Sequence, residues 1–477
     1  MTAGTTTTVP KKAWAQAIAQ PAEEFSLTPL PVLSGAVPSG LQGKLYRNGP
    51  GRLERQGQRV NHWFDGDGAV LAVHFSEGQA QATYRYVRSA GYLEEEKTNQ
   101  YLYSGYGTLA PGPLWRRWQA QLKNAGNTSV LVLPDKVLAL WEGGWPHCLD
   151  PKTLETTGID ALGQLLPNEP YSAHPKRHPK TGHIFNFGVV SGANATLNLY
   201  RSPVSGQIEQ KQSIPLNGIP LIHDFVLADR YLVFCVPPVR LNALPAVLGF
   251  QSFSDALMWQ PKHGTQLVII DANTLEVVSS EPTDPWFQWH FGKGFVNNDG
   301  DIVVEIVRYK DFATNQQLQE LASGEITTAA IGQLWRICID PQTAYIRSQT
   351  CLVEEHCEFP YVPGNHPIAT APTYLSIKAP RRTNPEEIFG AIARFDPDTA
   401  VLTIADAGAD CYPSEPVYVP KRDSTFTGWL VTVVYNGTTD QSEVWIYESD
   451  RLKEGPICRL QLPSIIPHSF HGTWQPD

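Results

Sequence analysis

Short runs of apolar, β-branched and aromatic residues recur along almost the whole chain, and polar turn-forming residues separate them. Examples of the runs are residues 70–75, 84–87, 129–133, 231–234, 266–270, 302–307 and 429–434. The separating sequences include Asn298-Asp299-Gly300 and Asn436-Gly437, which favour tight turns. Runs of this length and composition are typical of β-strands. The pattern therefore predicts an all-β protein built from many hairpins.

The domain organisation follows from what lies between these runs. Long amphipathic helices do not alternate with the strands, which disfavours a parallel α/β sheet, and no Pro- or Ser-rich linker divides the 477 residues. We expect a peripheral N-terminal arm at residues 1–25, with a short helix at 14–19, and a single domain at 26–477. Barrels, sandwiches and propellers all fit this pattern. Length favours a propeller, whereas the lack of a clear repeat counts against it.

Two segments interrupt the strand pattern. Residues 114–123 have the pattern of a basic amphipathic helix, and residues 244–259 are unusually apolar without strict alternation. In one interpretation both segments fold back over the domain as core. In the other they form an exposed apolar patch, with Arg116, Arg117 and Lys123 facing lipid headgroups. The second interpretation predicts peripheral membrane attachment that is hydrophobic and insensitive to salt.

Composition excludes several classes of protein. Hydrophobic residues make up 42% and charged residues 18%, and the net charge is −10, so a large core is expected and a basic nucleic-acid surface is not. The seven cysteines are odd in number and contain no C-x-x-C pair, which indicates reduced thiols rather than disulfides or a zinc site. There is no secretory signal and no run of 18 apolar residues, so we expect a cytoplasmic protein.

Four of the 13 histidines lie in apolar, strand-compatible settings, namely His174, His223, His290 and His471. The intervals are about 50 to 70 residues and then roughly three times as long, as one ligand per blade would give if two blades of a propeller lacked one. Near the C-terminus, His468 competes with His471. Residues three apart on a strand face opposite sides, and the adjacent glycine allows close approach of the backbone, which favours His471.

Nine short sequences in a fixed order point to a known family. They are LYRNGPG at 45–51, FDGDG at 64–68, ALWEGG at 139–144, SAHP at 172–175, IHDF at 222–225, GQLWR at 332–336, CEFP at 357–360, EPVYVP at 415–420 and HGTW at 471–474. Together they resemble the carotenoid cleavage oxygenases, and most nearly their cyanobacterial apocarotenoid-oxygenase branch. The resemblance covers nearly the whole chain.

The resemblance implies a seven-bladed β-propeller whose helical and loop inserts cap one face over an axial metal site. It implies one non-haem Fe(II) per chain, held by the four histidines singled out above. It also implies a monomeric dioxygenase that uses O2 to split a C=C bond of a carotenoid or apocarotenoid into aldehydes such as retinal. An all-histidine site differs from the usual arrangement of two histidines and one carboxylate, so outer carboxylates gain importance.

The resemblance also assigns residues around the metal. Glu142, Glu358 and Glu415 match glutamates that orient the ligand histidines, while His174 matches the ligand without such a glutamate. Thr128 matches a threonine beside the open iron position. The aromatic residues that flank these positions are expected to line a substrate tunnel; they are Trp141, Phe225, Trp289 and Phe359. After His290 the sequence departs from the family pattern, because Gly-Lys stands where an Asn and a small residue are common.

Two alternative functions stay open at this point. A stilbene-cleaving relative would share the fold and iron but need polar groups for a phenol at the tunnel's end. A non-catalytic propeller scaffold would bind no metal, and its histidines would be structural. The Asp65-Gly66-Asp67-Gly68 sequence resembles part of a calcium loop but lacks the other ligands, so a tight hairpin turn is the preferred interpretation.

Overall fold

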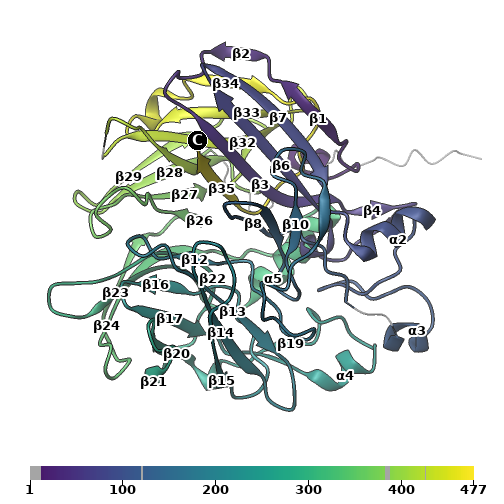
Figure 1. Cartoon of the computed structure of the whole chain (residues 1–477), viewed down its shortest axis with the longest axis vertical. Helices are drawn as coiled ribbons and strands as arrows, with labels where there is room; N and C mark the ends of the chain where they lie inside the picture. The colour runs from purple at the N-terminus through teal and green to yellow at the C-terminus, as the bar shows by residue number, and fades with distance from the viewer. Residues whose placement is uncertain (1–11, 120–121, 382–386, 425) are drawn as a thin grey trace, which may run out of the picture.

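The computed structural model describes residues 12–119, 122–381, 387–424 and 426–477. Over these residues, seven antiparallel sheets of four to six strands follow one another as the blades of a β-propeller (Figure 1). The predicted all-β, seven-bladed fold is confirmed. Each blade is a meander of neighbouring strands joined by short turns, as the alternation of apolar runs and turn residues requires.

The second to sixth blades have four strands each, consecutive along the chain apart from one insertion. Their strands are, blade by blade, β8 (Ser129–Val132), β9 (Val137–Leu140), β10 (His147–Leu149) and β11 (Thr156–Ile159); β12 (Lys176–Arg177), β13 (Ile184–Val190), β14 (Thr196–Ser202) and β15 (Gln210–Pro215); β16 (Val226–Ala228), β17 (Tyr231–Val236), β20 (Thr265–Asp271) and β21 (Val277–Thr283); β22 (Phe287–Val296), β23 (Ile302–Tyr309), β24 (Gln333–Ile339) and β25 (Ile346–Val353); and β26 (Cys357–Tyr361), β27 (Thr373–Ile377), β28 (Ala391–Asp396) and β29 (Val401–Asp406).

The first and seventh blades close the ring, because each combines strands from both ends of the chain. The first holds β1 (Phe25–Pro29), β3 (Gly43–Arg52), β6 (Asp67–Ser76), β7 (Gln79–Tyr86) and the C-terminal β35 (Gly472–Pro476). The seventh holds β2 (Val32–Gly35), β30 (Cys411–Pro413), β31 (Val417–Pro420), β32 (Gly428–Asn436), β33 (Gln441–Glu448) and β34 (Cys458–Gln461). The pairs β3–β35 and β2–β34 therefore fasten the ring on both sides of the closure.

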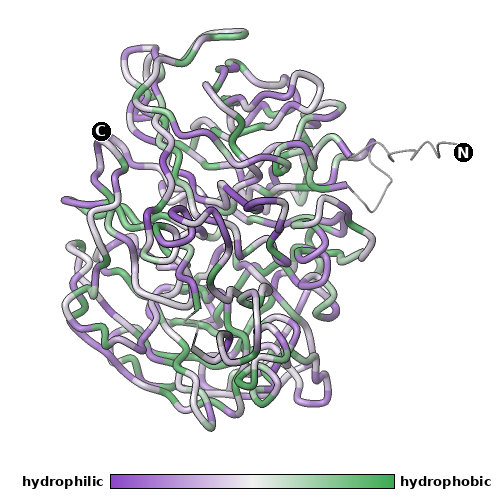
Figure 2. Tube along the Cα trace, turned by 90° about the vertical axis from the view of Figure 1, so that its right-hand side faces the viewer, coloured by the Kyte–Doolittle hydropathy of each residue, from purple (hydrophilic) through white to green (hydrophobic). Residues whose placement is uncertain are grey.

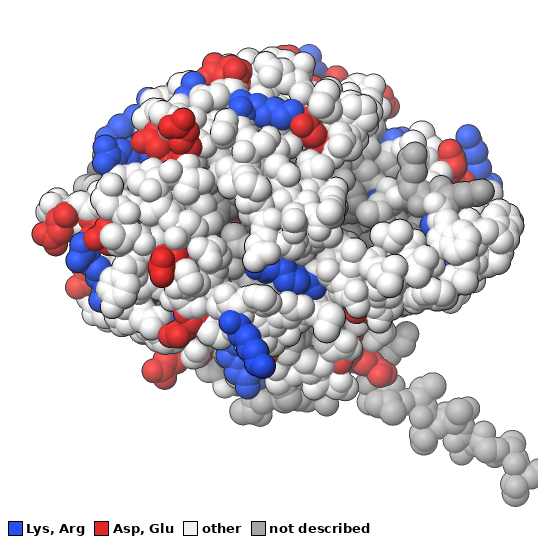
Figure 3. Space-filling view, turned by 90° about the horizontal axis from the view of Figure 1, so that it is seen from below, with Lys and Arg blue, Asp and Glu red and all other residues white. Residues whose placement is uncertain are grey.

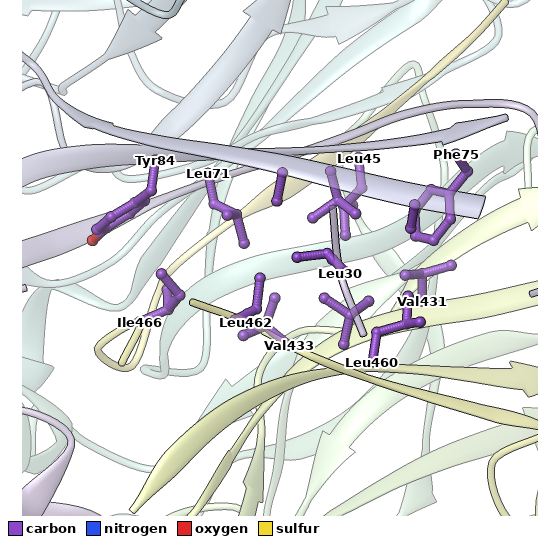
Figure 4. Close-up of a cluster of buried hydrophobic side chains, with 14 of the residues drawn as sticks. Leu30, Leu45, Leu71, Phe75, Tyr84, Val431, Val433, Leu460, Leu462 and Ile466 are labelled. Carbon is purple, nitrogen blue, oxygen red and sulfur yellow. The ribbon is translucent and has the colours of Figure 1, made fainter. Parts of the chain in front are cut away.

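A buried apolar cluster packs the first blade against the seventh (Figure 4). Leu45, Leu71 and Phe75 from the first blade face Val431 and Leu460 from the seventh, and all five are fully buried. Burying one such side chain contributes about 1.5 to 3 kcal/mol, so this interface supplies much of the free energy that holds the two ends of the chain together.

The elements outside the blades are short. They are α1 (Ala13–Gln16), α2 (Ala90–Thr98), α3 (Leu114–Gln119), α4 (Ala243–Val247), α5 (Ala313–Ser323), the 3-10 turns η1 (Trp63–Asp65), η2 (Pro261–His263) and η3 (Leu452–Glu454), and the strand pairs β4 (Glu54–Arg55) with β5 (Gln58–Arg59) and β18 (Val239–Leu241) with β19 (Leu257–Trp259). The helix α5 and the turn η1 contact each other and cover the cavity beside the histidines, as described below.

Residues 12–25 of the expected arm at 1–25 are not peripheral, which corrects that part of the expectation, and residues 1–11 lie outside the described residues. Trp14 is completely buried and Ile18 nearly so, in a cluster with Leu321, Tyr412 and Tyr435. The segment therefore belongs to the packed body from residue 12 onward. The short helix expected at 14–19 is present as α1, although it spans only Ala13–Gln16.

Apolar and polar stretches alternate along the chain throughout the body rather than separating into two halves (Figure 2), because each pair of blades has its own core. Seen from below, the surface carries scattered charges of both signs and no basic block (Figure 3). Among the described residues, no helix combines the length and the apolar character that crossing a bilayer would require.

Candidate metal centre

The four histidines singled out from the sequence come together although they are far apart in the chain. His174 precedes β12, His223 precedes β16, His290 lies within β22 and His471 precedes β35. Their ligand-type ring nitrogens all lie within 4.8 Å of one another. Each comes from a different blade, so the propeller ring itself brings them to one point.

Carboxylates bind the outer nitrogens of three of these rings. Glu358 Oε2 lies 2.6 Å from His290 Nδ1, Glu415 Oε1 lies 3.0 Å from His471 Nδ1, and Glu142 contacts His223 Nδ1. A carboxylate at Nδ1 holds the ring proton there and leaves Nε2 with a free lone pair. Glu142 approaches His174 only at Nε2, 3.9 Å away. His174 therefore has no carboxylate at Nδ1, as the family resemblance implied.

The free lone pairs of His223 and His290 converge, with their Nε2 atoms 3.2 Å apart. His174 Nε2 joins them, 3.0 Å from His223 Nε2. Burial, reinforced by the neighbouring imidazoles, holds the pKa of both His174 and His290 well below 6.5, so these rings are neutral. Converging lone pairs repel each other unless a cation lies between them. The residues present therefore fit a metal ion, and imidazole suits iron, zinc, copper and nickel alike.

The backbone beside Glu358 is irregular. Glu358 also accepts hydrogen bonds from Phe359 N at 2.7 Å and Tyr309 Oη at 3.1 Å, and burial raises its pKa to about 7. Phe359 has φ of 54° within a register shift of β26, a backbone conformation that is rare for an aromatic residue. This bulge aims the carboxylate at His290 and stacks the Phe359 ring 5.2 Å from that histidine.

Glu415 is held in place by a backbone N–H group and by a buried arginine. Gly472 N donates to its Oε2 at 2.6 Å, while the buried Arg47 donates to its backbone carbonyl at 2.7 Å. Burial acts to raise the pKa of Glu415, but the attraction of His471 and, next, of Arg47 acts more strongly in the opposite direction. The pKa of Glu415 is therefore below its usual value. Glu415 is therefore ionised and able to accept the His471 Nδ1 proton.

His468 lies outside the cluster, in agreement with the preference for His471. Its Nε2 lies 2.8 Å from the carbonyl oxygen of Trp14, and burial lowers its pKa to about 4. His468 therefore connects the N-terminal segment to the C-terminal loop. It has a packing role and is not one of the four rings whose nitrogens converge.

Two cavities meet at the histidines. One extends from Trp289 and Phe359 toward Phe389 and encloses about 1070 Å³. The other extends past Trp141 and encloses about 1410 Å³. The residues that line both are Phe64, Thr128 and His223. Thr128 thus stands where the two cavities join.

The aromatic residues expected around a tunnel divide into two groups. Trp141, Trp289 and Phe359 each line a cavity. Phe225 does not, because it packs against Phe187 and Phe234 between two blades and is completely buried. The expectation of a substrate contact at Phe225 is therefore dropped.

The departure from the family pattern after His290 leaves the cavity walls intact. Lys293 is buried away from both cavities, where it donates to the Ala371 carbonyl and lies 3.5 Å from Glu305. A Cβ atom on Gly294 would lie only 2.7 Å from the Val226 side chain. The Gly-Lys-Gly sequence thus serves contacts between blades.

Sequence reasoning missed Phe64 and Tyr309. Phe64 stacks parallel to His223 at 6.4 Å and lines both cavities. The FDGDG motif contained the signal, but a hairpin turn was preferred there, and that interpretation is wrong. Asp65 ends η1 and accepts from Tyr106 N at 2.6 Å, while Asp67 begins β6 and pairs with Arg55 at 2.7 Å. These carboxylates are occupied by protein donors.

Comparison with known proteins shows which family this chain belongs to. The sequence profile of the retinal pigment epithelial membrane protein family matches residues 18–476. An apocarotenoid-15,15'-oxygenase from Synechocystis is 30% identical over 456 residues, which cover 93% of this chain and 92% of that protein. This chain belongs to the carotenoid oxygenase family. The predicted family resemblance is confirmed.

Other members of the carotenoid oxygenase family extend the comparison. Cobalt-substituted Synechocystis apocarotenoid oxygenase superposes with a TM-score of 0.87 at 29% identity, covering 98% of both chains. Resveratrol cleavage oxygenase 1 from Aspergillus fumigatus is 24% identical over 464 residues, 92% of this chain and 91% of that protein. The fold is thus shared by relatives named for polyene and for stilbene substrates.

Proposed function

We propose that this protein is a non-haem Fe(II)-dependent dioxygenase that cleaves a C=C bond of a carotenoid or apocarotenoid. One alkene and one O2 give two carbonyl groups, so the oxygen and electron balance needs no further cofactor. The observation that carries the proposal is the convergence of four imidazole nitrogens, three of them oriented by glutamates, where two cavities meet. Iron bound by His174, His223, His290 and His471 would supply the activation of O2.

The chain's own residues orient and desolvate the substrate. The wall beside the histidines is aromatic, with Trp289 in edge contact with His223 at 4.8 Å and Phe359 stacked on His290. Flat apolar side chains of this kind suit a planar conjugated chain. They also exclude water from the reacting bond. Thr128, at the junction of the two cavities, restricts the space beside the metal.

A polyene is favoured over a stilbene by the form of the cavities. Space continues on both sides of the histidines, which a long chain would occupy and a short diaryl alkene would leave partly empty. Leu318, Leu321 and Ile388 continue the apolar wall of one cavity. Resveratrol cleavage oxygenase 1 is a family relative, so a stilbene remains the second substrate to test.

The two interrupting segments support a membrane-contact surface. We define the α3–α4 patch as the exposed residues Trp115, Trp118, Leu122, Leu244, Val247, Leu248 and Phe250. Trp118 Nε1 donates to the Leu248 carbonyl at 2.7 Å, and Arg117 donates to the Gly249 carbonyl at 3.0 Å. The two helices thus form one surface at the lower right of Figure 1, and uncharged residues predominate on the right of Figure 3.

The α3–α4 patch has a particular chemistry. Val247 is 74% exposed and Phe250 59%, whereas Lys123 is buried in ion pairs with Asp67 and Glu95. The expectation that Lys123 faces lipid headgroups is therefore wrong. Leu122 belongs both to the patch and to the cavity past Trp141, so the patch adjoins a cavity that leads to the histidines. We propose that it takes apolar substrate from a lipid surface.

The proposed function is tested by metal analysis followed by product analysis. Protein purified without added metal is assayed for iron, then supplied with Fe(II) and incubated separately with a C40 carotenoid, an apocarotenal and a stilbene. We expect one iron per chain and aldehyde products from the apocarotenal in chromatography. A chain that binds no metal would support the scaffold alternative. Products from the stilbene alone would show that the substrate is a stilbene rather than a carotenoid or apocarotenoid.

A further inference from the structure

The cavity that extends past Phe359 ends at a polar junction with a second, outer cavity. Four residues line both, namely Gln317 on α5, His356 just before β26, Lys378 just after β27, and Glu387. The backbone N–H of Lys378 donates to the His356 carbonyl at 2.9 Å, which fixes the two residues beside each other. This junction plays no part in holding the metal.

An aromatic wall leads from the metal centre to this junction. The His290 ring lies 5.2 Å from Phe359, Phe359 lies 6.5 Å from Phe389, and Phe389 lies 4.9 Å from His356. A conjugated chain that passes the metal on this side therefore meets apolar rings along its length. At the far end of this cavity it meets the polar side chains of the junction.

His356 presents an N–H group at the junction. Its Nδ1 accepts a hydrogen bond from Gly332 N at 3.0 Å. Burial lowers its pKa to about 4, so the ring is neutral and its single proton is on Nε2. Among the described residues, no acceptor lies within hydrogen-bond distance of this Nε2–H group.

Lys378 adds a positive charge at the same place. It is half-buried, and no carboxylate of the described residues lies within ion-pair distance of its ammonium group. Glu387, on the opposite side of the junction, already accepts from Tyr412 Oη at 3.1 Å and lies 3.9 Å from Lys12 Nζ. The junction therefore offers two hydrogen-bond donors that line the cavity and have no acceptor among the residues that the structure describes.

We propose that His356 and Lys378 bind an oxygen at the end of the substrate, the terminal aldehyde or carboxylate of an apocarotenoid. The inference rests on the proposed function and adds which end of the chain is recognised. Donors without an acceptor complement a carbonyl or carboxylate oxygen and gain nothing from a hydrocarbon end. Lys378 and His356 are positioning residues, because they hold the chain in register while the bond near the histidines reacts.

The test measures binding without turnover. Iron-loaded protein is titrated under anaerobic conditions with three polyenes of equal length, which end in a carboxylate, an aldehyde or a methyl group, and tryptophan fluorescence is recorded. Lys378→Met removes the charge at nearly constant length, and Lys378→Arg restores it. Lys310→Met is the matched control, because Lys310 is exposed and lines none of the three cavities. Absence of oxygen makes the result independent of whether the protein cleaves these compounds.

We expect Lys378→Met to weaken the carboxylate ligand about 10- to 100-fold and the aldehyde about 2- to 10-fold, the usual effects of losing a charged and a neutral hydrogen bond. The methyl-ended ligand and the Lys310→Met protein should keep their wild-type values, and Lys378→Arg should recover most of the carboxylate affinity. Equal weakening of all three ligands, or no change in any, would overturn the inference. Retained discrimination without cleavage in air would instead disprove only the proposed reaction.

Discussion

Replacing Glu358 with glutamine tests the most detailed feature of the metal centre. The carboxylate accepts three hydrogen bonds, from His290 Nδ1 at 2.6 Å, Phe359 N at 2.7 Å and Tyr309 Oη at 3.1 Å. A glutamine side chain has nearly the same shape but only one accepting oxygen. The amide oxygen can take the place of Oε2, which serves both His290 and Phe359, and the Tyr309 hydroxyl can accept from the amide N–H₂ group. The variant therefore keeps the hydrogen bonds but loses the carboxylate charge beside the His290 ring.

The magnitude follows from these contacts. A hydrogen bond to a charged group contributes about 1.5 to 3 kcal/mol net, and about 1.4 kcal/mol corresponds to a tenfold change in an equilibrium constant. Replacing the charged acceptor at His290 by a neutral one should therefore weaken iron binding about 10- to 100-fold, in the range seen for outer carboxylates of metal sites. Loss of a ligand itself should cost more, because a coordination position disappears.

The assay is a competition titration of Fe(II) between the protein and a chelator under anaerobic conditions. Cleavage at limiting and at saturating iron is measured in parallel. Glu281→Gln is the matched control, since Glu281 is exposed on β21 and distant from the histidines. We expect Glu358→Gln to recover much of its activity at saturating iron. Wild-type iron affinity together with wild-type activity at limiting iron would refute the orienting role of Glu358.

Other predictions concern metal, membrane and pH. His471→Ala should lose most bound iron and nearly all cleavage, whereas His468→Ala should keep its iron, and equal iron contents in metal analysis would contradict the assignment. Leu248→Ser with Phe250→Ser should reduce co-sedimentation with liposomes at low and high salt and leave cleavage of detergent-solubilised substrate intact, while Ile159→Ser, at an exposed site on β11, should change neither. Normal liposome binding by the double variant would exclude the patch. The buried His468 has a pKa of about 4, against 6.5 when the chain is unfolded. Between these pH values the unfolded state binds more protons, so the free energy of unfolding falls as pH drops, by up to about 3 kcal/mol from this residue. His468→Gln should flatten that slope in urea titrations at pH 4 to 7.

The sequence predicted the parts of the site that depend on local pattern. His174, His223, His290 and His471 could be singled out because each is a polar residue in an apolar strand context, and such a residue needs a partner. The all-β class followed from run length and turn residues. The order of the nine family motifs then specified seven blades, which composition and periodicity alone could not separate from a barrel or a sandwich.

What the sequence could not predict depends on contacts between distant residues. Phe225 lies two residues after the ligand His223 and Phe359 one residue after Glu358, yet Phe225 packs between blades and Phe359 lines a cavity. The difference comes from the bulge at Phe359, which has no local signature. Trp14 becomes core only because β32, α5 and the C-terminal loop surround it. Lys123 is buried because Asp67 and Glu95 face it.

The two proposals about substrate combine into one statement about which bond is cut. If His356 and Lys378 hold the oxygenated end, the reacting bond is the one that lies beside the four histidines at a fixed distance from that end. The rest of the chain then extends past Thr128 into the cavity that adjoins the α3–α4 patch. Two apocarotenals that differ only in the length of their hydrocarbon end should therefore release the same oxygenated fragment, which chromatography with mass detection would identify. Fragments whose length changes with the hydrocarbon end would show that the chain is positioned from the patch side, and the anchoring role of the junction would then be wrong.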